Sequence, residues 1–326
     1  MATIWFDTSA PARRAGHGSV VALRDWTLGV EVGLPSPPGV IPVMPKYVPC
    51  RGGPWASAGA SFCRIISVYG PRGLSESLER LGLRQTYDPA YGAPMPYVSQ
   101  EQVVAYVSPR GALARVLRGG SPLGPSLARV VEAVAREVGG SDLVGLTGSI
   151  AMGVEQPFSD IDLVIYGGEG SERAFDLFVR RAEPVAPTRG EEQNYGGVVV
   201  RAAFPAQWRR GLLKDLAGVP VSWVGVPMDV ASHCGPLRSR QGLGPHKVPV
   251  SGLVLTVQPG QEGALLYPPC VRAEEGVHLV SYEFNLGAAL YLGGVFRVDG
   301  ISFGGTLVLG ARELPGSLVK LKEYRR

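Results

Sequence analysis

The alternation of apolar and polar positions is clearest in the middle of the chain. Leu143 to Thr147 is a short apolar run of strand length, bounded by polar residues or glycine. The turn Gly148-Ser149 follows, and the Ser149 hydroxyl can cap a short helix that begins at Ile150. The pattern therefore predicts a strand, a tight turn and a short helix over residues 143–154.

A second strand is expected from about Asp160. Pro157 cannot continue a helix, so the chain must loop before the run Asp-Ile-Asp-Leu-Val-Ile-Tyr, which ends at Tyr166. Side chains alternate between the two faces of a strand, so Asp160 and Asp162 are predicted to share one face while Ile161 points into the protein. This spacing predicts two carboxylates side by side at the start of a strand.

Helical spacing surrounds these strands. A linker over residues 118–125 precedes a helix that Ser126 can cap, and Gly139-Gly140 ends it. We predict helices at 127–138, 171–181 and 206–217 and a strand at 219–226. The apolar positions that mark the three helices are Leu127, Val130, Val131, Val134 and Val138, then Phe175 and Phe178, then Trp208, Leu212 and Leu216. This order predicts a small mixed α/β domain whose sheet is covered mainly on one side.

The two ends of the chain show short apolar runs separated by glycine and proline. Runs at 19–32, 40–48 and 60–69 predict strands, and residues 74–81 fit a helix. From about Val248, five or six short strands in about 75 residues suggest a small barrel. We therefore predict an α/β (α+β) protein with an N-terminal α+β domain over 1–120, a central domain over 121–235 and a small β-barrel over 246–326.

Composition narrows the class of protein without identifying it. Only 18% of the 326 residues are charged and 45% are hydrophobic, which indicates a folded chain rather than a disordered one. The net charge of +4 permits a polyanionic partner, but no dense Lys/Arg block marks a nucleic-acid surface. No apolar stretch reaches the 18 residues of a membrane span and no signal peptide is visible, so we expect a soluble, cytoplasmic protein with no membrane partner. The four cysteines form no C-x-x-C pair, and buried free thiols are the simplest interpretation.

The paired carboxylates indicate chemistry. At about 5 Å and an effective dielectric near 20, Asp160 and Asp162 would repel by roughly 3 kcal/mol, so a positive partner is expected. Magnesium suits the position, because proteins usually hold it through one or two carboxylates plus substrate phosphates. Backbone N–H groups at the Gly148-Ser149 turn can attract phosphate, and glycine permits close approach. Together these features favour phosphoryl or nucleotidyl transfer.

Gly148-Ser149 followed by Asp160-Ile-Asp162 resembles the nucleotidyltransferase signature of the DNA polymerase β superfamily. From about Arg24 onward the chain is also similar to a group of archaeal predicted nucleotidyltransferases. The resemblance implies a third carboxylate on a later strand, acting as metal ligand or general base. The matching strand, Val219 to Val226, carries no acid, so Asp229 just past its end is the candidate, with Glu191 and Glu192 as alternatives.

The hypothesis from the sequence is a nucleotidyltransferase that depends on Mg²⁺ (or Mn²⁺). Asp160, Asp162 and Asp229 are the predicted catalytic residues, with Asp160 and Asp162 as metal ligands and Gly148 and Ser149 as nucleotide-binding residues. The substrate would be a nucleoside triphosphate, and the acceptor hydroxyl is not identified. The alternative is a catalytically inactive protein that binds nucleotide or RNA.

Basic residues offer further contacts, with two interpretations left open. RNA or DNA is a candidate partner through the C-terminal barrel. Arginines around the polar stretch 188–195, including Arg209 and Arg210, can hold phosphate. Lys46, Arg64 and Arg72 can contact a substrate. Scattered, solvated cations are the simpler interpretation of all of them.

Overall fold

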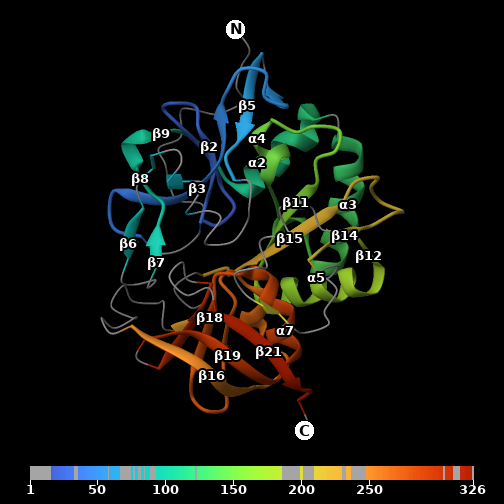
Figure 1. The fold of residues 1–326 in the computed structure, drawn as a ribbon. Helices are drawn as coiled ribbons and strands as arrows, with labels where there is room; N and C mark the ends of the chain where they lie inside the picture. Colours follow the sequence, from blue (N-terminus) through green and yellow to red (C-terminus); the bar gives the residue numbers. More distant parts are fainter. Residues whose placement is uncertain are drawn as a thin grey trace. The chain divides into compact units, whose positions relative to one another are not determined.

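The computed structural model describes residues 16–32, 36–57, 59–66, 75, 78–79, 82–83, 85–88, 93–121, 123–185, 199–200, 209–229, 233–235, 247–303, 305–310 and 316–324. The chain divides into two compact units (Figure 1). Unit 1 comprises residues 1–66, 96–185 and 206–226, and unit 2 comprises residues 67–95, 186–205 and 227–326. The three-domain division at residues 121 and 246 stays a prediction.

An antiparallel sheet forms the N-terminal part of unit 1. Its strands follow the order β4-β5-β3-β2-β1-β9, and β8 also pairs with β3. Val21, Leu23, Ile41 and Val43 form a buried cluster on it, because the alternating pattern of these strands places their apolar side chains on one face. The strands are β1 (Val20–Leu23), β2 (Leu28–Glu31), β3 (Val40–Pro49), β4 (Trp55–Ser57), β5 (Ala60–Arg64), β8 (Tyr97–Ser99) and β9 (Val103–Val107).

A five-stranded mixed sheet forms the other part of unit 1. Its order is β10-β11-β15-β14-β12, and β11 pairs antiparallel with β10 and parallel with β15. The predicted order of strand, short helix and strand is present as β10, α4 and β11, but α4 begins at Gly148, so Ser149 lies inside the helix and the predicted cap by Ser149 is wrong. The strands are β10 (Val144–Thr147), β11 (Ile161–Tyr166), β12 (Glu183–Pro184), β14 (Arg210–Leu212) and β15 (Val221–Val226).

Helices α3 and α5 pack on one face of this sheet (Figure 1). The five predicted apolar positions of α3 are all buried, and Phe175 and Phe178 of α5 are buried as well. Phe178 lies 6.3 Å from Trp223 of β15 between ring centroids, which anchors α5 to the middle of the sheet. The helical elements of unit 1 are α2 (Pro109–Arg115), α3 (Gly124–Val138), α4 (Gly148–Met152), α5 (Gly168–Arg181) and the short turns η1 (Gln100–Gln102), η2 (Val116–Gly120) and η3 (Ser141–Leu143).

The opposite face of the five-stranded sheet is also covered, in contrast to the expectation of a sheet covered mainly on one side. A Cβ atom added to Gly18 would lie 2.8 Å from Cγ2 of Val164, and the Thr147 hydroxyl donates to the Gly18 carbonyl at 2.7 Å. Helix α2 packs against β10, where a Cβ on Gly145 would lie 2.6 Å from Cβ of Pro109. The turn before β1 and helix α2 therefore cover the face that carries Val164.

The predicted helix over 206–217 is wrong where the structure describes it. Residues 210–212 form β14, which pairs with β15 on one side and β12 on the other. The four-residue spacing of Trp208, Leu212 and Leu216 fits a helix. Backbone hydrogen bonds of β14 to the neighbouring strands β12 and β15 override this local pattern.

The C-terminal strands in unit 2 form an open sheet rather than the predicted closed barrel. The order is β13-β21-β19-β20-β18-β17, with β16 paired along β19. Closure needs a ladder between the end strands, but among the described residues only one isolated bridge, Val257 to Ala273, joins β16 to the residue after β17. The strands are β13 (Val199–Val200), β16 (Val248–Val257), β17 (Cys270–Arg272), β18 (His278–Ser281), β19 (Gly294–Phe303), β20 (Thr306–Leu309) and β21 (Ser317–Lys322).

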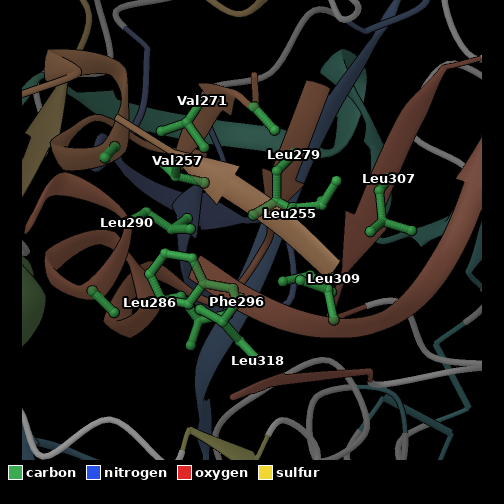
Figure 2. Close-up of a cluster of buried hydrophobic side chains, with 14 residues drawn as sticks. Leu255, Val257, Val271, Leu279, Leu286, Leu290, Phe296, Leu307, Leu309 and Leu318 are labelled. Carbon is green, nitrogen blue, oxygen red and sulfur yellow. The ribbon is translucent and has the colours of Figure 1, made fainter. Parts of the chain in front are cut away.

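One apolar cluster stabilises this curled sheet. Figure 2 shows the side chains of its strands and of α7 converging, with Phe296 fully buried among them. Burial of this cluster, rather than barrel closure, holds the strands together. The remaining elements of unit 2 are β6 (Thr86–Asp88), β7 (Ala93–Met95), η7 (Glu262–Leu265), η8 (Phe284–Leu286) and α7 (Gly287–Leu292).

The cysteines form two disulfides, so the interpretation as free thiols is wrong. Cys50 pairs with Cys63 and Cys234 pairs with Cys270, each with 5.6 Å between Cα atoms. Cys50 and Cys63 are brought together because β3 and β5 pair antiparallel, with Val48 opposite Cys63. Cross-strand pairing of this kind leaves no trace in sequence spacing. In the part of the chain that the structure describes, no helix has the length and apolar character that a bilayer crossing requires.

Candidate active site

The start of α4, where the chain turns out of β10 at Gly148-Ser149, lies directly against an aspartate. Gly148 has φ +72°, and a Cβ atom at this position would lie 2.0 Å from Oδ2 of Asp162. Only glycine satisfies both conditions, because it tolerates a positive φ and has no side-chain atom. Ser149 follows it and is 9% exposed. The backbone of the turn and the Asp162 carboxylate therefore form one compact feature.

Asp162 is the second residue of β11, and β11 lies between β10 and β15 in the sheet. Its direct partners are Thr147 on β10 and Ser222 on β15. The Ser222 hydroxyl donates a hydrogen bond to Oδ1 of Asp162. The residue beside Asp162 on the parallel strand is thus a hydroxyl donor, at the strand where the resemblance implies a third carboxylate.

Asp160 lies just before β11 and pairs with an arginine. Nε of Arg210 donates to Oδ2 of Asp160 at 2.8 Å, and the two side chains are only 13% and 27% exposed. Arg210 is the direct cross-strand partner of Ser222, so the side chains of these two residues share one face of the sheet. Because Arg210 reaches Asp160 and Ser222 reaches Asp162, both carboxylates lie on that face.

Arg210 therefore supplies a positive charge beside the two carboxylates. A charge-assisted hydrogen bond at this exposure is worth more than the 0–1 kcal/mol typical of surface pairs, because fewer waters compete for it. It offsets much of the roughly 3 kcal/mol of repulsion expected between two carboxylates.

A lysine of the N-terminal sheet interacts electrostatically with Asp162. Lys46 of β3 is half-buried, and burial is the main cause that lowers its pKa, while the charge of Asp162 opposes this shift. Arg64 and Arg209 also act on Lys46, and both lower its pKa further. The site thus gathers basic residues from both sheets of unit 1.

Neighbouring side chains respond to the same charges. Burial and the charge of Lys46 lower the pKa of His17 to about 3, so this imidazole is neutral at pH 7. Burial raises the pKa of Tyr47, and Asp162 raises it further while Arg64 lowers it. The charge of Asp162 or of Lys46 therefore shifts the pKa of three residues in the N-terminal sheet or the turn before it, namely His17, Lys46 and Tyr47.

The third carboxylate stays a prediction. Asp229 is exposed, lies three residues beyond the end of β15 and is part of unit 2. Glu191 and Glu192 lie outside the described residues, as does Arg72. The structure brings Gly148, Ser149, Asp160 and Asp162 together.

Sequence reasoning missed the roles of three groups. The sequence favours Lys46 and Arg64 as scattered, solvated cations, yet Lys46 interacts electrostatically with both Asp162 and Arg64. Ser222 lies in an apolar strand and gave no chemical signal. The register between β11 and β15 places Ser222 beside Asp162, and register depends on the whole sheet.

The two carboxylates fit a magnesium ion in type and number. They are hard oxygen donors on one face, and Mg²⁺ is commonly held by one or two carboxylates together with substrate phosphates. Among the described residues, no group of three His, Cys, Asp or Glu side chains can hold a metal ion. A divalent cation at Asp160 and Asp162 would therefore complete its ligands with water and phosphate oxygens.

The fold and the site together describe one kind of domain. It has a mixed sheet, a Gly-Ser turn after one strand, and two carboxylates at the start of the next strand, β11. Residues 127–224 match the family model of the nucleotidyltransferase domain, which covers α3 to β15. Asp160, Asp162, Arg210 and Ser222 all lie inside this segment, whereas Lys46 lies outside it. No curated protein and no solved structure matches the chain significantly.

Proposed function

We propose that the protein transfers a nucleoside monophosphate from a nucleoside triphosphate to an acceptor hydroxyl and releases pyrophosphate. The oxygen of the acceptor hydroxyl bonds to the α-phosphorus, the bond from that phosphorus to the pyrophosphate oxygen breaks, and the hydroxyl proton leaves to solvent. The supporting observation is the contact of the Gly148 backbone with the Asp162 carboxylate inside the matched segment.

The residues of the turn bind and orient the substrate in this proposal. The backbone around Gly148 and Ser149 lies beside a carboxylate with no intervening side chain, so a phosphate chain can approach the turn closely. Asp160 and Asp162 would hold Mg²⁺ or Mn²⁺, which when bound neutralises the phosphates and polarises the reacting phosphorus.

Arg210 and Ser222 position the two carboxylates. Arg210 fixes Asp160 through one hydrogen bond, and Ser222 fixes Asp162 through another. Both contacts restrain the carboxylates on one face before substrate arrives, which lowers the entropy lost on binding. We keep Asp229 as the proposed third carboxylate.

The test is transfer of label from α-phosphate-labelled nucleoside triphosphates with Mg²⁺ or Mn²⁺, using RNA, protein and small-molecule fractions as acceptors. Asp160→Asn and Asp162→Asn should each abolish transfer while the protein stays folded. Asp176→Asn is the matched control, because Asp176 is an exposed aspartate on α5. Transfer that persists in both site variants would refute the mechanism, and Asp229→Asn tests the third carboxylate in the same assay.

A non-catalytic binding protein is the second candidate. Ser222 occupies the position beside Asp162 on the parallel strand, and the described residues provide no third acidic ligand there. Such a protein would bind nucleoside triphosphate in calorimetry without transferring label to any acceptor. Binding that depends on Asp162 but yields no product with any acceptor fraction would favour this function over transfer.

A further inference from the structure

Lys46 occupies a special position in the N-terminal sheet. Leu28 pairs with Tyr47 and Gly29 pairs with Pro45, so Lys46 is the extra residue of a β-bulge in β3. Gly29 is required opposite the bulge, because a Cβ there would lie 2.6 Å from Cγ1 of Val43. A bulge redirects a side chain relative to the regular alternation of a strand, and bulges are common beside functional sites.

The neighbouring strand places a second cation next to this bulge. The Ile65 amide donates to the Lys46 carbonyl at 2.8 Å, and Arg64 is the direct partner of Tyr47. Lys46 and Arg64 are therefore held on adjacent strands by backbone hydrogen bonds. Adjacent strand residues normally point to opposite faces, yet the charge of Asp162 raises the pKa of both Lys46 and Tyr47. The bulge accounts for this, because it disturbs the alternation at Lys46.

Like charges act on Lys46 from both sheets of unit 1. Lys46 experiences the charges of Arg64 and Arg209 as well as that of Asp162. A partly desolvated lysine among arginines favours a polyanion, because phosphate oxygens lower the energy of every cation in the group at once.

We propose that Lys46, with Arg64 beside it, binds the polyphosphate chain of the nucleotide, so that the N-terminal sheet completes a nucleotide site begun by the nucleotidyltransferase domain. This inference rests on the proposed function for the identity of the ligand, but its contacts are with phosphate alone. Lysine acts here as a compact point charge, and arginine adds a planar pair of donors.

The experiment measures binding of inorganic tripolyphosphate to the full chain by calorimetry, in EDTA and at low salt. Lys46→Met keeps the length and apolar stem of the side chain while removing its charge. We expect it to weaken binding about tenfold or more, the effect of losing one charge-assisted hydrogen bond. Lys46→Arg should retain most of the affinity, and Arg64→Ala should weaken it. Arg51→Ala is the matched control, because Arg51 is an exposed cation in the turn after β3 of the same sheet.

The outcomes separate this inference from the proposed function. If Lys46→Met binds tripolyphosphate as the wild type does, or if only Arg51→Ala weakens binding, the inference is overturned even where label transfer succeeds. If the wild type binds tripolyphosphate through Lys46 but transfers no label, the inference stands and the transferase activity fails. Thermal unfolding of Lys46→Met and Lys46→Arg verifies that both variants are folded.

Discussion

Gly148→Ala tests the contact on which the candidate site depends. The substitution introduces two costs: an alanine with φ near +72°, and a Cβ atom 2.0 Å from Oδ2 of Asp162. Contacts of a Cβ atom below 3.0 Å are essentially never seen, so the carboxylate must move by about 1 Å. The carboxylate is held by Ser222, so it cannot move without disturbing that hydrogen bond.

The loss of stability in Gly148→Ala is the sum of a backbone cost and the loss of the hydrogen bond from Ser222 to Asp162. A left-handed conformation costs a residue other than glycine roughly 1–2 kcal/mol. Loss of a hydrogen bond to a charged, partly buried group adds about 1–3 kcal/mol. Gly148→Ala should therefore destabilise the protein by about 2–5 kcal/mol, and the displaced carboxylate should reduce label transfer on the order of 100-fold.

Gly52→Ala is the matched control for this experiment. Gly52 has φ +67° and lies in the same unit, but a Cβ atom there meets nothing within 4 Å. It should cost only the backbone term, about 1–2 kcal/mol, and leave transfer unchanged. The measurements are urea unfolding and label transfer for both variants. Equal destabilisation of the two variants, with normal transfer by Gly148→Ala, would refute the assigned role of the turn.

Three further outcomes are expected. Phe178→Ala should lower the free energy of unfolding by about 3–5 kcal/mol, because it leaves a cavity beside Trp223. The control Val179→Ala, at the exposed neighbouring residue, should change this free energy by less than about 1 kcal/mol, and urea unfolding measures both variants. His17 should destabilise the protein as pH falls from 6.5 toward 3, because the unfolded chain binds a proton that the folded chain excludes; the wild type should lose at most about 3 kcal/mol more than His17→Gln between pH 7.5 and pH 4.5. Thiol titration without reductant should find no reactive cysteine in the native protein and four after reduction in denaturant, and any free thiol in the unreduced, unfolded chain would contradict the disulfide pairing.

The segment of the candidate site from β10 to β11 could be predicted because its signals are local. Alternation from Asp160 onward defines β11, and the glycine at position 148 marks a turn whose geometry admits no side chain. The apolar stripe from Leu127 to Val138 likewise defines α3 without reference to the rest of the protein. Each of these patterns reflects a periodicity within a few residues of chain.

The rest of the site depends on pairing between distant segments. Arg210 belongs to β14, where a helix-like spacing conceals a strand, and it meets Asp160 only because β14 lies beside β15. Lys46, proposed as a phosphate ligand, lies in a bulge that is defined by the register of β2 against β3. The open form of the C-terminal sheet similarly depends on which end strands pair, and strand spacing alone does not determine this.

The internal cations change what a bound metal must do. With Arg210 already hydrogen-bonded to Asp160 and Lys46 near Asp162, the carboxylates are partly neutralised before any ligand arrives. A divalent cation alone must compete with these charges, and apart from the water that it keeps it gains only two carboxylate ligands. A metal bound together with a triphosphate faces a smaller barrier, because the phosphates both complete its ligands and provide new partners for the displaced cations. Metal and nucleotide should therefore bind with positive coupling, each strengthening the affinity for the other by the same factor.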